Sequence, residues 1–278
     1  MRQFETIRYQ ANKYCPCGRS NKGGKFATEK GFRNQPIGHC FSCNKDFWDN
    51  NTLDTQTIVY HKQPAINYCH PPIEDISETF DHKLQSGFAK FLVENFGKTK
   101  AEEVVEMYFL GNYNGDVIFW QLGRNNDVRA GKIIPYLPNG KRNRNDLPNW
   151  WHKVKGKDCQ LRQCLFGDHL IPDHDKPIAV VESAKSACIM HLCNPYYIWL
   201  SAEGLHGLSY DKCNSIKDYE VVLFPDAGYY QEWEKKANEF GFDISLDCEI
   251  WKEKGIINDK EDIADYYLNK YSPEVLSN

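Results

Sequence analysis

The chain has 278 residues and a formal net charge of −4, and 41% of its residues are hydrophobic. This apolar content is enough to build packed cores, which excludes wholesale disorder. No apolar run reaches the length of a membrane span, and the opening MRQFETIRYQ lacks the apolar stretch of a signal peptide. We therefore expect a cytoplasmic protein with no membrane partner, whose 11 cysteines are metal ligands and buried thiols rather than a disulfide framework.

The net charge conceals a strong asymmetry along the chain. Residues 1–48 hold nine basic against three acidic side chains, and residues 124–157 hold nine against two, which gives +6 and +7. From residue 220 to the end, fourteen acids face six lysines, which gives −8. The two basic segments are suited to phosphate contacts and the acidic segment to divalent cations, although an uneven solvated surface would show the same totals.

Residues 1–50 contain two close pairs of cysteines, Cys15 with Cys17 and Cys40 with Cys43. Four thiolates in two pairs are the ligands of a tetrahedral structural zinc, and a segment with so little apolar content needs such a staple to fold. His39 is an alternative ligand beside Cys40. The zinc would do no chemistry; it would hold a basic and aromatic surface suited to single-stranded nucleic acid. That surface would include Lys25, Phe26, Arg33, Phe41, Phe47 and Trp48.

Residues 51–84 are polar and contain prolines, which is typical of a linker. Within 85–175 we expect a mixed α+β subdomain. The stretch 86–110 predicts two short helices joined at Gly97, and DVIFWQL (116–122) and AGKIIPYL (130–137) predict strands around a turn. The segment from Trp150 to Ile171 shows no clear pattern.

Residues 176–278 alternate short apolar runs with helical patterns, which indicates a four-stranded parallel sheet of α/β, Rossmann-like type. The expected strands are IAVVES (178–183), YYIWLSA (196–202), EVVLFPD (220–226) and SLDCEIW (245–251). Helices are expected over 184–192, 209–217, 229–240 and 262–271.

Acidic residues follow these strands where an open parallel sheet places functional groups. Glu182 ends the first strand and Asp226 the third, and Asp262 and Asp265 begin the last helix. Carboxylates that converge in a buried place repel one another unless a cation joins them, and oxygen ligands suit Mg²⁺. Each acid taken alone is also compatible with a helix N-cap, Asp262 above all.

Three of these segments resemble the motifs of toprim domains, which bacterial and phage primases, topoisomerases and some nucleases share. VVESAKSA resembles the glutamate motif, VVLFPDAG the aspartate motif, and KEDIADYYL a late element of toprim primases. The order of zinc-ribbon-like module, middle region and toprim region is also similar to those primases. It resembles, in addition, zinc-finger toprim proteins of Bacteroidetes genomes, phages and mobile elements.

The resemblance implies synthesis of short RNA primers on single-stranded DNA from nucleoside triphosphates, in DNA replication. It implies Glu182 and Asp226 as catalytic residues, and these two with Asp262 and Asp265 as ligands of Mg²⁺ or Mn²⁺. Arg129, Lys132, Lys141 and Arg142, together with Lys25 and Arg33, are candidates for contacts to nucleic acid or triphosphate. A helicase would be a separate protein, because the chain has no GxxxxGK[ST] loop.

One position departs from the family pattern. Toprim aspartate motifs usually carry a second aspartate two residues after the first, where this chain has Gly228. Two alternatives therefore stay open: a toprim nuclease that uses the same acids, and a non-catalytic, zinc-dependent DNA-binding accessory protein.

Overall fold

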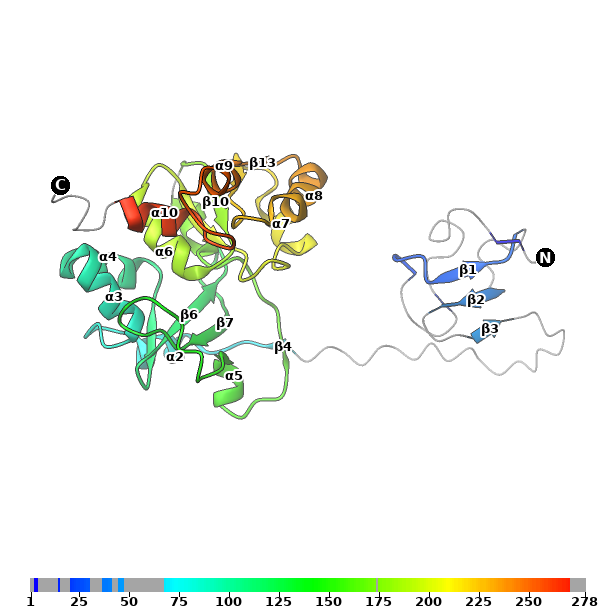
Figure 1. The fold of residues 1–278 in the computed structure, drawn as a ribbon. Helices are drawn as coiled ribbons and strands as arrows, with labels where there is room; N and C mark the ends of the chain where they lie inside the picture. The colour runs from blue at the N-terminus through cyan, green and yellow to red at the C-terminus, as the bar shows by residue number, and fades with distance from the viewer. Residues whose placement is uncertain are drawn as a thin grey trace. The chain divides into compact units, whose positions relative to one another are not determined.

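The structure is a computed structural model that describes residues 3–4, 15, 21–30, 37–41, 45–47, 68–173 and 175–270. It divides into two units, Met1–Asn67 and Tyr68–Asn278, and each is described by itself (Figure 1). Among the described residues no helix is both long and apolar enough to cross a membrane.

The first unit contains a three-stranded antiparallel sheet of β1 (Phe26–Thr28), β2 (Gly38–Cys40) and β3 (Lys45–Phe47), in that order. Gly38, on β2, lies so close to β1 that a Cβ there would overlap the carbonyl of Ala27, so only glycine fits. Cys15, Phe26 and Cys40 form a small core, with Phe47 packed on its edge. Phe26, which we expected on a nucleic-acid-binding surface, is therefore buried, because it stands on the inward face of the pleat.

The second unit begins with helices packed on an antiparallel sheet, and we call residues 73–154 the antiparallel-sheet lobe. Ser86 caps α3 by accepting a hydrogen bond from the N–H of Ala89 (3.1 Å), and Gly97, at φ 81°, separates α3 from α4 as predicted. α2 lies within the segment that we expected to be an irregular linker. The helices are α2 (Ile73–Thr79), α3 (Gly87–Phe96), α4 (Lys98–Met107) and α5 (Trp151–Val154). The sheet runs in the order β5 (Gly111–Tyr113), β6 (Asp116–Leu122), β7 (Val128–Ile134) and β8 (Asn149–Trp150).

A short parallel pair, β4 (Tyr68–Cys69) with β9 (Gln160–Leu161), ties the start of this unit to the segment that follows α5. Cys69 and Cys159 form a disulfide there, with their Cα atoms 5.5 Å apart. Our expectation that these two cysteines would be packed thiols was therefore wrong. Sequence spacing could not reveal the pair, because 90 residues separate its members. A 3₁₀ helix, η1 (Asp168–Asp173), completes the connection.

A four-stranded parallel sheet forms the rest of the unit, and we call residues 178–270 the parallel-sheet lobe. Its strand order is β11 (Ile198–Ser201), β10 (Ile178–Val181), β12 (Val221–Leu223) and β13 (Asp243–Ile244). Its helices are α6 (Ala184–Cys193), α7 (Tyr210–Ile216), α8 (Tyr230–Phe240), α9 (Asp247–Glu253) and α10 (Ile263–Lys270). The α/β class and the four parallel strands agree with the sequence pattern.

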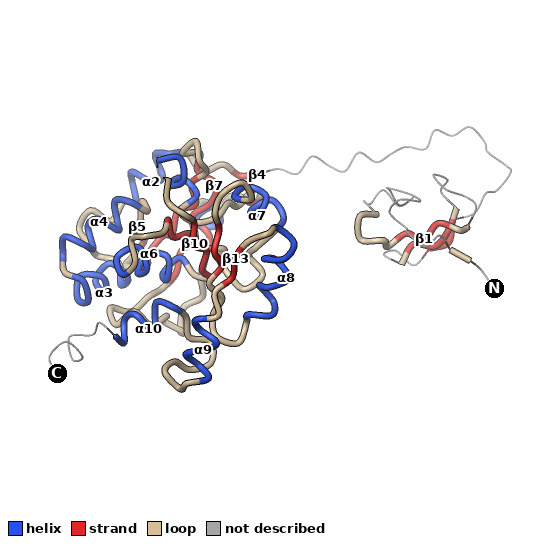
Figure 2. Tube along the Cα trace, turned by 90° about the horizontal axis from the view of Figure 1, so that it is seen from above, coloured by secondary structure: helices blue, strands red, loops and turns tan. Residues whose placement is uncertain are grey.

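Both faces of the parallel sheet are covered, which explains why its strands are apolar throughout. On β10, Ile178 and Val180 pack in the core that contains residues of α7 and α8, whereas Ala179 and Val181 pack in the core of α6 and α10. Figure 2 shows these helices on opposite sides of β10 and β13. The second of these cores also contains residues of α3 and α4, so it joins the two lobes.

The predicted strand at 245–251 is a helix instead, and the fourth strand is the shorter β13. The alternation of Leu246, Cys248 and Ile250 is typical of a strand, but only Cys248 is buried. Asp247 and Glu249 lie in the first turn of α9, where acidic side chains interact favourably with the helix dipole.

Candidate active site

The four predicted acids lie at one edge of the parallel sheet, where the sheet topology brings them together. Glu182 directly follows β10, and Asp226 lies three residues after the end of the neighbouring strand β12. Asp262 and Asp265 stand at the start of α10, which packs against α6. The C-terminal ends of β10 and β12 and the first turn of α10 therefore converge on one place.

Asp262 and Asp265 form a reciprocal cap at the start of α10. The N–H of Asp265 donates to Oδ1 of Asp262 (3.0 Å), and the N–H of Asp262 donates to Oδ2 of Asp265 (3.1 Å). The buried hydroxyl of Ser186 on α6 donates to Oδ2 of Asp262, and Ser183 lies 2.7 Å from that hydroxyl. Both carboxylate oxygens of Asp262 thus have protein partners, as expected for a helix N-cap.

Glu182 and Asp226 differ from this pair because each has a buried oxygen without a hydrogen bond. Oε2 of Glu182 and Oδ1 of Asp226 find no hydrogen-bond partner among the described residues. Burial raises the pKa of Asp226 well above its usual range, and the charges of Asp262, Glu182 and Asp265 raise it further. Burial also raises the pKa of Glu182, although the backbone N–H of Leu205 opposes the rise. Negative charge here is therefore costly unless a cation joins it.

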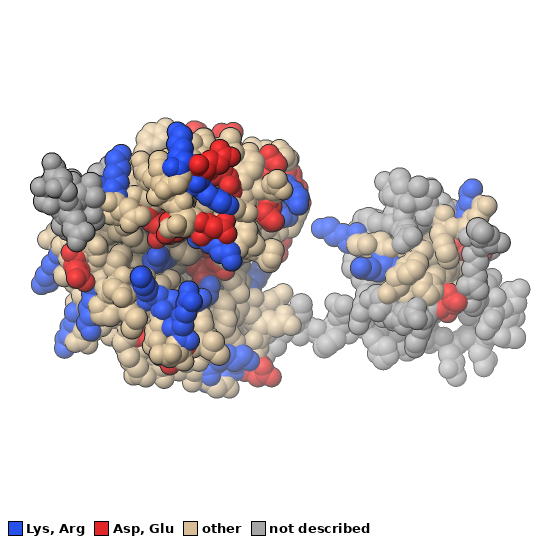
Figure 3. Space-filling view, in the orientation of Figure 1, with Lys and Arg blue, Asp and Glu red and all other residues tan. Residues whose placement is uncertain are grey.

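A charged cleft of about 590 Å³ is lined by three of these acids, Asp226, Asp262 and Asp265; Glu182 is not in its lining, although the adjoining Ser183 is. Five basic side chains and a tyrosine complete the charged and polar lining. Three of the cations follow β7 in the antiparallel-sheet lobe, whereas Lys185 and Lys260 belong to the same lobe as the acids. In Figure 3, Lys and Arg gather over the lobe of β6 and β7, and Asp and Glu gather above them, over the lobe of α9 and α10. The other side chains of this charged cleft are Tyr136, Lys141, Arg142, Arg144, Ser183, Lys185 and Lys260.

The predicted basic residues do not all reach the charged cleft. Lys141 and Arg142 line it, whereas Arg129 forms an ion pair with Asp127. Lys132 lies 2.8 Å from a carboxylate oxygen of Glu203, whose side chain is only 3% exposed. The structure therefore assigns two of these four cations to structural ion pairs, while Arg144, Lys185 and Lys260 line the cleft in addition.

Those three cleft cations were missed in the sequence for different reasons. Arg144 lies in the basic block 124–157 and could have been included, whereas Lys185 and Lys260 are isolated lysines outside the two basic blocks. Lys185 lies 3.8 Å from Asp265. Lys260 has φ +66°, a strained backbone that its hydrogen bond to the carbonyl of Ala227 (3.0 Å) helps to hold.

Gly228, the departure from the toprim pattern, sits in a loop whose backbone conformation would strain any other residue. Its φ is +94°, and a Cβ added there would lie 2.8 Å from Oδ1 of Asp259 and 3.3 Å from Nζ of Lys252. These two groups form an ion pair with a separation of 2.7 Å. The N–H of Gly228 donates to Glu249 (2.6 Å). The acids nearest this position thus come from α9 and from the loop before α10.

The orphaned oxygens of Glu182 and Asp226 fit a hard divalent cation, which prefers oxygen ligands. No group of three or more His, Cys, Asp or Glu side chains in the described part of the chain is arranged to ligate one ion. A cation held by these two carboxylates would take its remaining ligands from water or from the phosphates of a substrate.

The predicted zinc site falls only partly within the described residues. Cys15 and Cys40 lie in the same small core, which fits a shared ion, but Cys17 and Cys43 lie outside the described residues. Nδ1 of His39, the alternative ligand, lies 2.8 Å from Asp46. Of the two basic residues predicted on this unit, Lys25 is exposed and Arg33 lies outside the described ranges.

Comparisons with solved structures give low identities throughout. The primase fragment of the bacteriophage T7 primase-helicase is 15% identical over 86% of this chain and 88% of its own, with a TM-score of 0.45. The DnaG primase catalytic domain bound to single-stranded DNA is 12% identical over 72% of each chain, with a TM-score of 0.46. The Escherichia coli primase catalytic core is 12% identical over 73% and 79%, with a TM-score of 0.35.

Comparisons of sequence give a single family. No curated protein matches the chain. A family model described as a domain of unknown function, DUF6371, matches residues 86–227, which include α3, the antiparallel sheet, Glu182 and Asp226. The chain belongs to this DUF6371 family.

Proposed function

We propose that the chain is a primase-like nucleotidyltransferase that binds single-stranded DNA and joins nucleoside triphosphates into short RNA primers with Mg²⁺ or Mn²⁺. The observation that carries the proposal is the charged cleft, which three carboxylates and five cations line together. A nucleoside triphosphate with its metal carries both kinds of charge, so it complements both sides. The resemblance of the segments around Glu182, Asp226 and Asp262 to toprim motifs supports the same reaction.

Each side of the charged cleft has a role in this proposal. Lys141, Arg142 and Arg144 bind the triphosphate and neutralise the charge that develops during transfer. Glu182 and Asp226 hold Mg²⁺ with their unpartnered oxygens. Bound Mg²⁺ supplies charge neutralisation and polarises the reacting phosphate. The raised pKa of Glu182 also suits a proton acceptor for the attacking hydroxyl.

Asp262 and Asp265 support this site in the same proposal. Their reciprocal cap fixes the start of α10, and Ser186 fixes Asp262 to α6. Both acids contribute negative potential that strengthens cation binding at Asp226. In the first unit, we propose a structural zinc on Cys15, Cys17, Cys40 and Cys43. It would keep the basic surface of residues 1–50 in shape for DNA, and a separate helicase would open the duplex.

A second candidate is a DNA-binding accessory protein that has lost catalysis. The Gly228 loop favours it, because the φ of +94° would strain a second aspartate and the Lys252–Asp259 ion pair would have to shift to admit its side chain. A metal-dependent nuclease that uses the same acids is a third outcome of the test.

The test is one reaction read in two ways. The full chain is incubated with single-stranded DNA, nucleoside triphosphates and Mg²⁺ or Mn²⁺, with label either on the nucleotides or on the DNA. Labelled short RNA products support the primase proposal, and shortened labelled DNA supports the nuclease. DNA binding that weakens with salt but yields neither product identifies the accessory protein. Lys141→Ala should lower the yield of RNA product, because Lys141 is proposed to bind the triphosphate. Arg129→Ala is its control and should not lower the yield, because the guanidinium of Arg129 is held in an ion pair with Asp127.

A further inference from the structure

A second concavity lies at the far end of the β6–β7 hairpin from the charged cleft. It is an apolar pocket of about 450 Å³, lined by Ile73, Ile76, Ser77, Phe80, His82, Phe109, Leu122 and Asn126. Leu122 pairs with Val128 at one end of the hairpin, whereas Val117 pairs with Ile134 at the other, two residues before Tyr136 of the charged cleft. Strands of seven residues separate the two places by roughly 20 Å. The apolar pocket is therefore not part of the proposed catalytic site.

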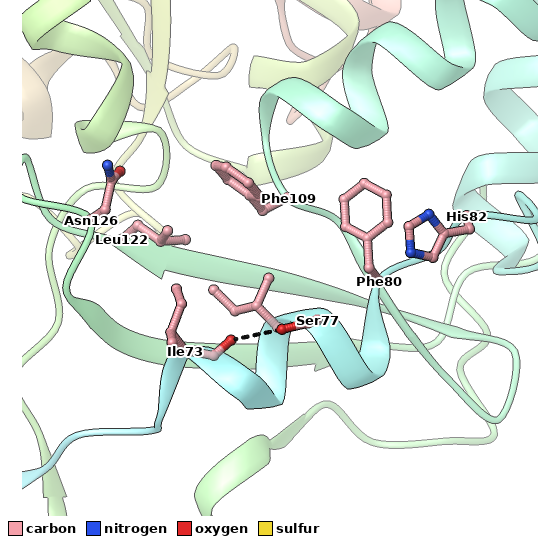
Figure 4. A pocket seen from close by; sticks show the side chains of 8 residues that line it. Ile73, Ser77, Phe80, His82, Phe109, Leu122 and Asn126 are labelled. Atoms are coloured by element: carbon pink, nitrogen blue, oxygen red, sulfur yellow. Dashed lines mark hydrogen bonds between the residues drawn. The ribbon is translucent and has the colours of Figure 1, made fainter.

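The apolar pocket exposes hydrophobic surface that the fold itself leaves uncovered. Figure 4 shows Ile73 and Ser77 on α2, with Phe109 and Leu122 across from them and Phe80 beside His82. Ile73, which lines this pocket, is 51% exposed and so leaves apolar surface open to solvent. The hydroxyl of Ser77 donates to the carbonyl of Ile73 (3.5 Å), so it is directed at its own helix and not at a ligand. Recognition here is thus by apolar contact, and contiguous apolar surface of this kind marks interaction sites.

Phe109 reaches this pocket from a backbone conformation that large side chains avoid. Its φ is +50°, and Asn126, also in the lining, has φ +59°. A large side chain such as Phe109 is strained at positive φ, and such strain gathers at functional places in proteins. The ring of Phe109 packs against His169 at 5.4 Å, which holds it at the wall of the pocket.

The charge around the apolar pocket favours a basic partner over nucleic acid. Residues 73–82 supply five of the eight lining side chains and contain two exposed acids, Glu74 and Glu78, and two buried ones, Asp75 and Asp81; Lys83 follows them directly. Phe80 and His82 also line an adjoining small cavity with Glu102 and Glu106; its third acid, Asp81, is buried and accepts hydrogen bonds from backbone N–H groups. The lysines that pair with these acidic segments are Lys155, with Asp75 and Glu78, and Lys98, with Glu102. Phosphates would be repelled here, whereas lysine or arginine would be attracted.

We propose that the apolar pocket binds a polypeptide segment of a partner protein that inserts one large apolar side chain, flanked by lysine or arginine. The anchor fills the space between Ile73, Phe80 and Phe109, and the basic flank faces Glu102 and Glu106. This arrangement follows the usual division of an interface into an apolar anchor and a charged rim. The proposal is independent of catalysis, so it stands or falls separately from primer synthesis.

The experiment selects a phage-displayed library of random dodecapeptides on the full chain, after depletion on the Ile73→Ala variant. We expect enriched peptides to share one aromatic or branched aliphatic residue near two or more basic ones. The best peptide should bind Ile73→Ala about tenfold more weakly, and Glu106→Gln should weaken it by several-fold. Ile256→Ala is the matched control, because Ile256 is 50% exposed and lies elsewhere on the surface. It should bind like the unaltered chain.

Isoleucine methyl NMR then locates the bound peptide. The δ1 methyl signals of Ile73 and Ile76 should shift on titration, and the shift should fall as salt rises. Failure to enrich any peptide that depends on Ile73 would overturn the proposal, as would enrichment of acidic peptides. If oligothymidylate moves these two methyl signals instead, the apolar pocket is a nucleic-acid site and the proposal is wrong.

Discussion

Replacing Asp226 with asparagine should stabilise the metal-free protein at alkaline pH. Burial and the neighbouring carboxylates raise the pKa of Asp226 to about 9, from 3.8 for an unperturbed aspartate. Below about pH 4 the folded and unfolded chains both carry the proton. As the pH rises from there towards 9, the unfolded chain loses the proton first, so the free energy of unfolding falls. Asparagine has the same shape and no charge, so it removes this penalty.

The size of the effect follows from the shift in pKa. Each unit of difference in pKa between the folded and unfolded chains is worth about 1.4 kcal/mol. Between the unfolded pKa of 3.8 and pH 8, the free energy of unfolding would therefore fall by roughly 6 kcal/mol. We assign about half of this loss to Asp226, because the shift arises jointly from its interaction with Glu182 and Asp262. We then subtract about 1 kcal/mol, because the buried amide of the asparagine would lack a hydrogen-bond partner. The net gain of about 2 kcal/mol should raise the Tm of a unit of this size by roughly 4–8 °C.

Thermal unfolding in EDTA at pH 8 and pH 4.5 measures this directly. Asp226→Asn should melt above the unaltered chain at pH 8 and close to it at pH 4.5. Added Mg²⁺ should raise the Tm of the unaltered chain but not that of Asp226→Asn, since the variant lacks the ligand. The control is Asp218→Asn, an exposed aspartate on the same lobe, which should change little. Equal melting of Asp226→Asn and the unaltered chain at pH 8 would refute the reasoning.

Three further substitutions test the surroundings of the charged cleft and the first unit. Gly228→Asp should lose more stability in urea unfolding than Gly255→Asp, because both glycines have positive φ but only the former has side chains within 4 Å of a new Cβ. Equal losses would mean that backbone strain alone matters. Ser186→Ala should cost about 1–2 kcal/mol, because it removes a buried hydrogen bond to Asp262; unchanged stability would show that this bond contributes nothing. Cys40→Ser should lose bound zinc in elemental analysis and leave residues 68–270 folded by circular dichroism; full zinc retention would rule out Cys40 as a ligand.

The sequence predicted the elements whose signals are local. The apolar run over 178–181 is a parallel strand because helices cover both faces of the sheet, and Gly97 divides two helices because it adopts a positive φ. The helix over 247–253 was missed because its apolar residues alternate, and only the structure shows that Leu246 and Ile250 are exposed.

The candidate site was predicted in part for a similar reason. Strand ends place Glu182 and Asp226 together, and that rule can be applied to a sequence. Which cations lie near them also depends on packing between the two lobes, which brings Lys141 and Arg142 to the cleft but pairs Lys132 with Glu203. The disulfide and the apolar pocket likewise depend on contacts between segments far apart in the chain.

The central claim is that nucleotidyl transfer takes place in the charged cleft and requires Glu182. The most direct measurement is the initial rate at which labelled nucleotide is incorporated into RNA on single-stranded DNA, compared among the unaltered chain, Glu182→Gln and Glu253→Gln. Glu253 is an exposed glutamate on α9 and serves as the matched control. We predict that Glu182→Gln lowers the rate by roughly 100-fold or more, because the lost charge acts at the reacting phosphate, and that Glu253→Gln leaves it unchanged. Incorporation by Glu182→Gln at the rate of the unaltered chain would contradict the account.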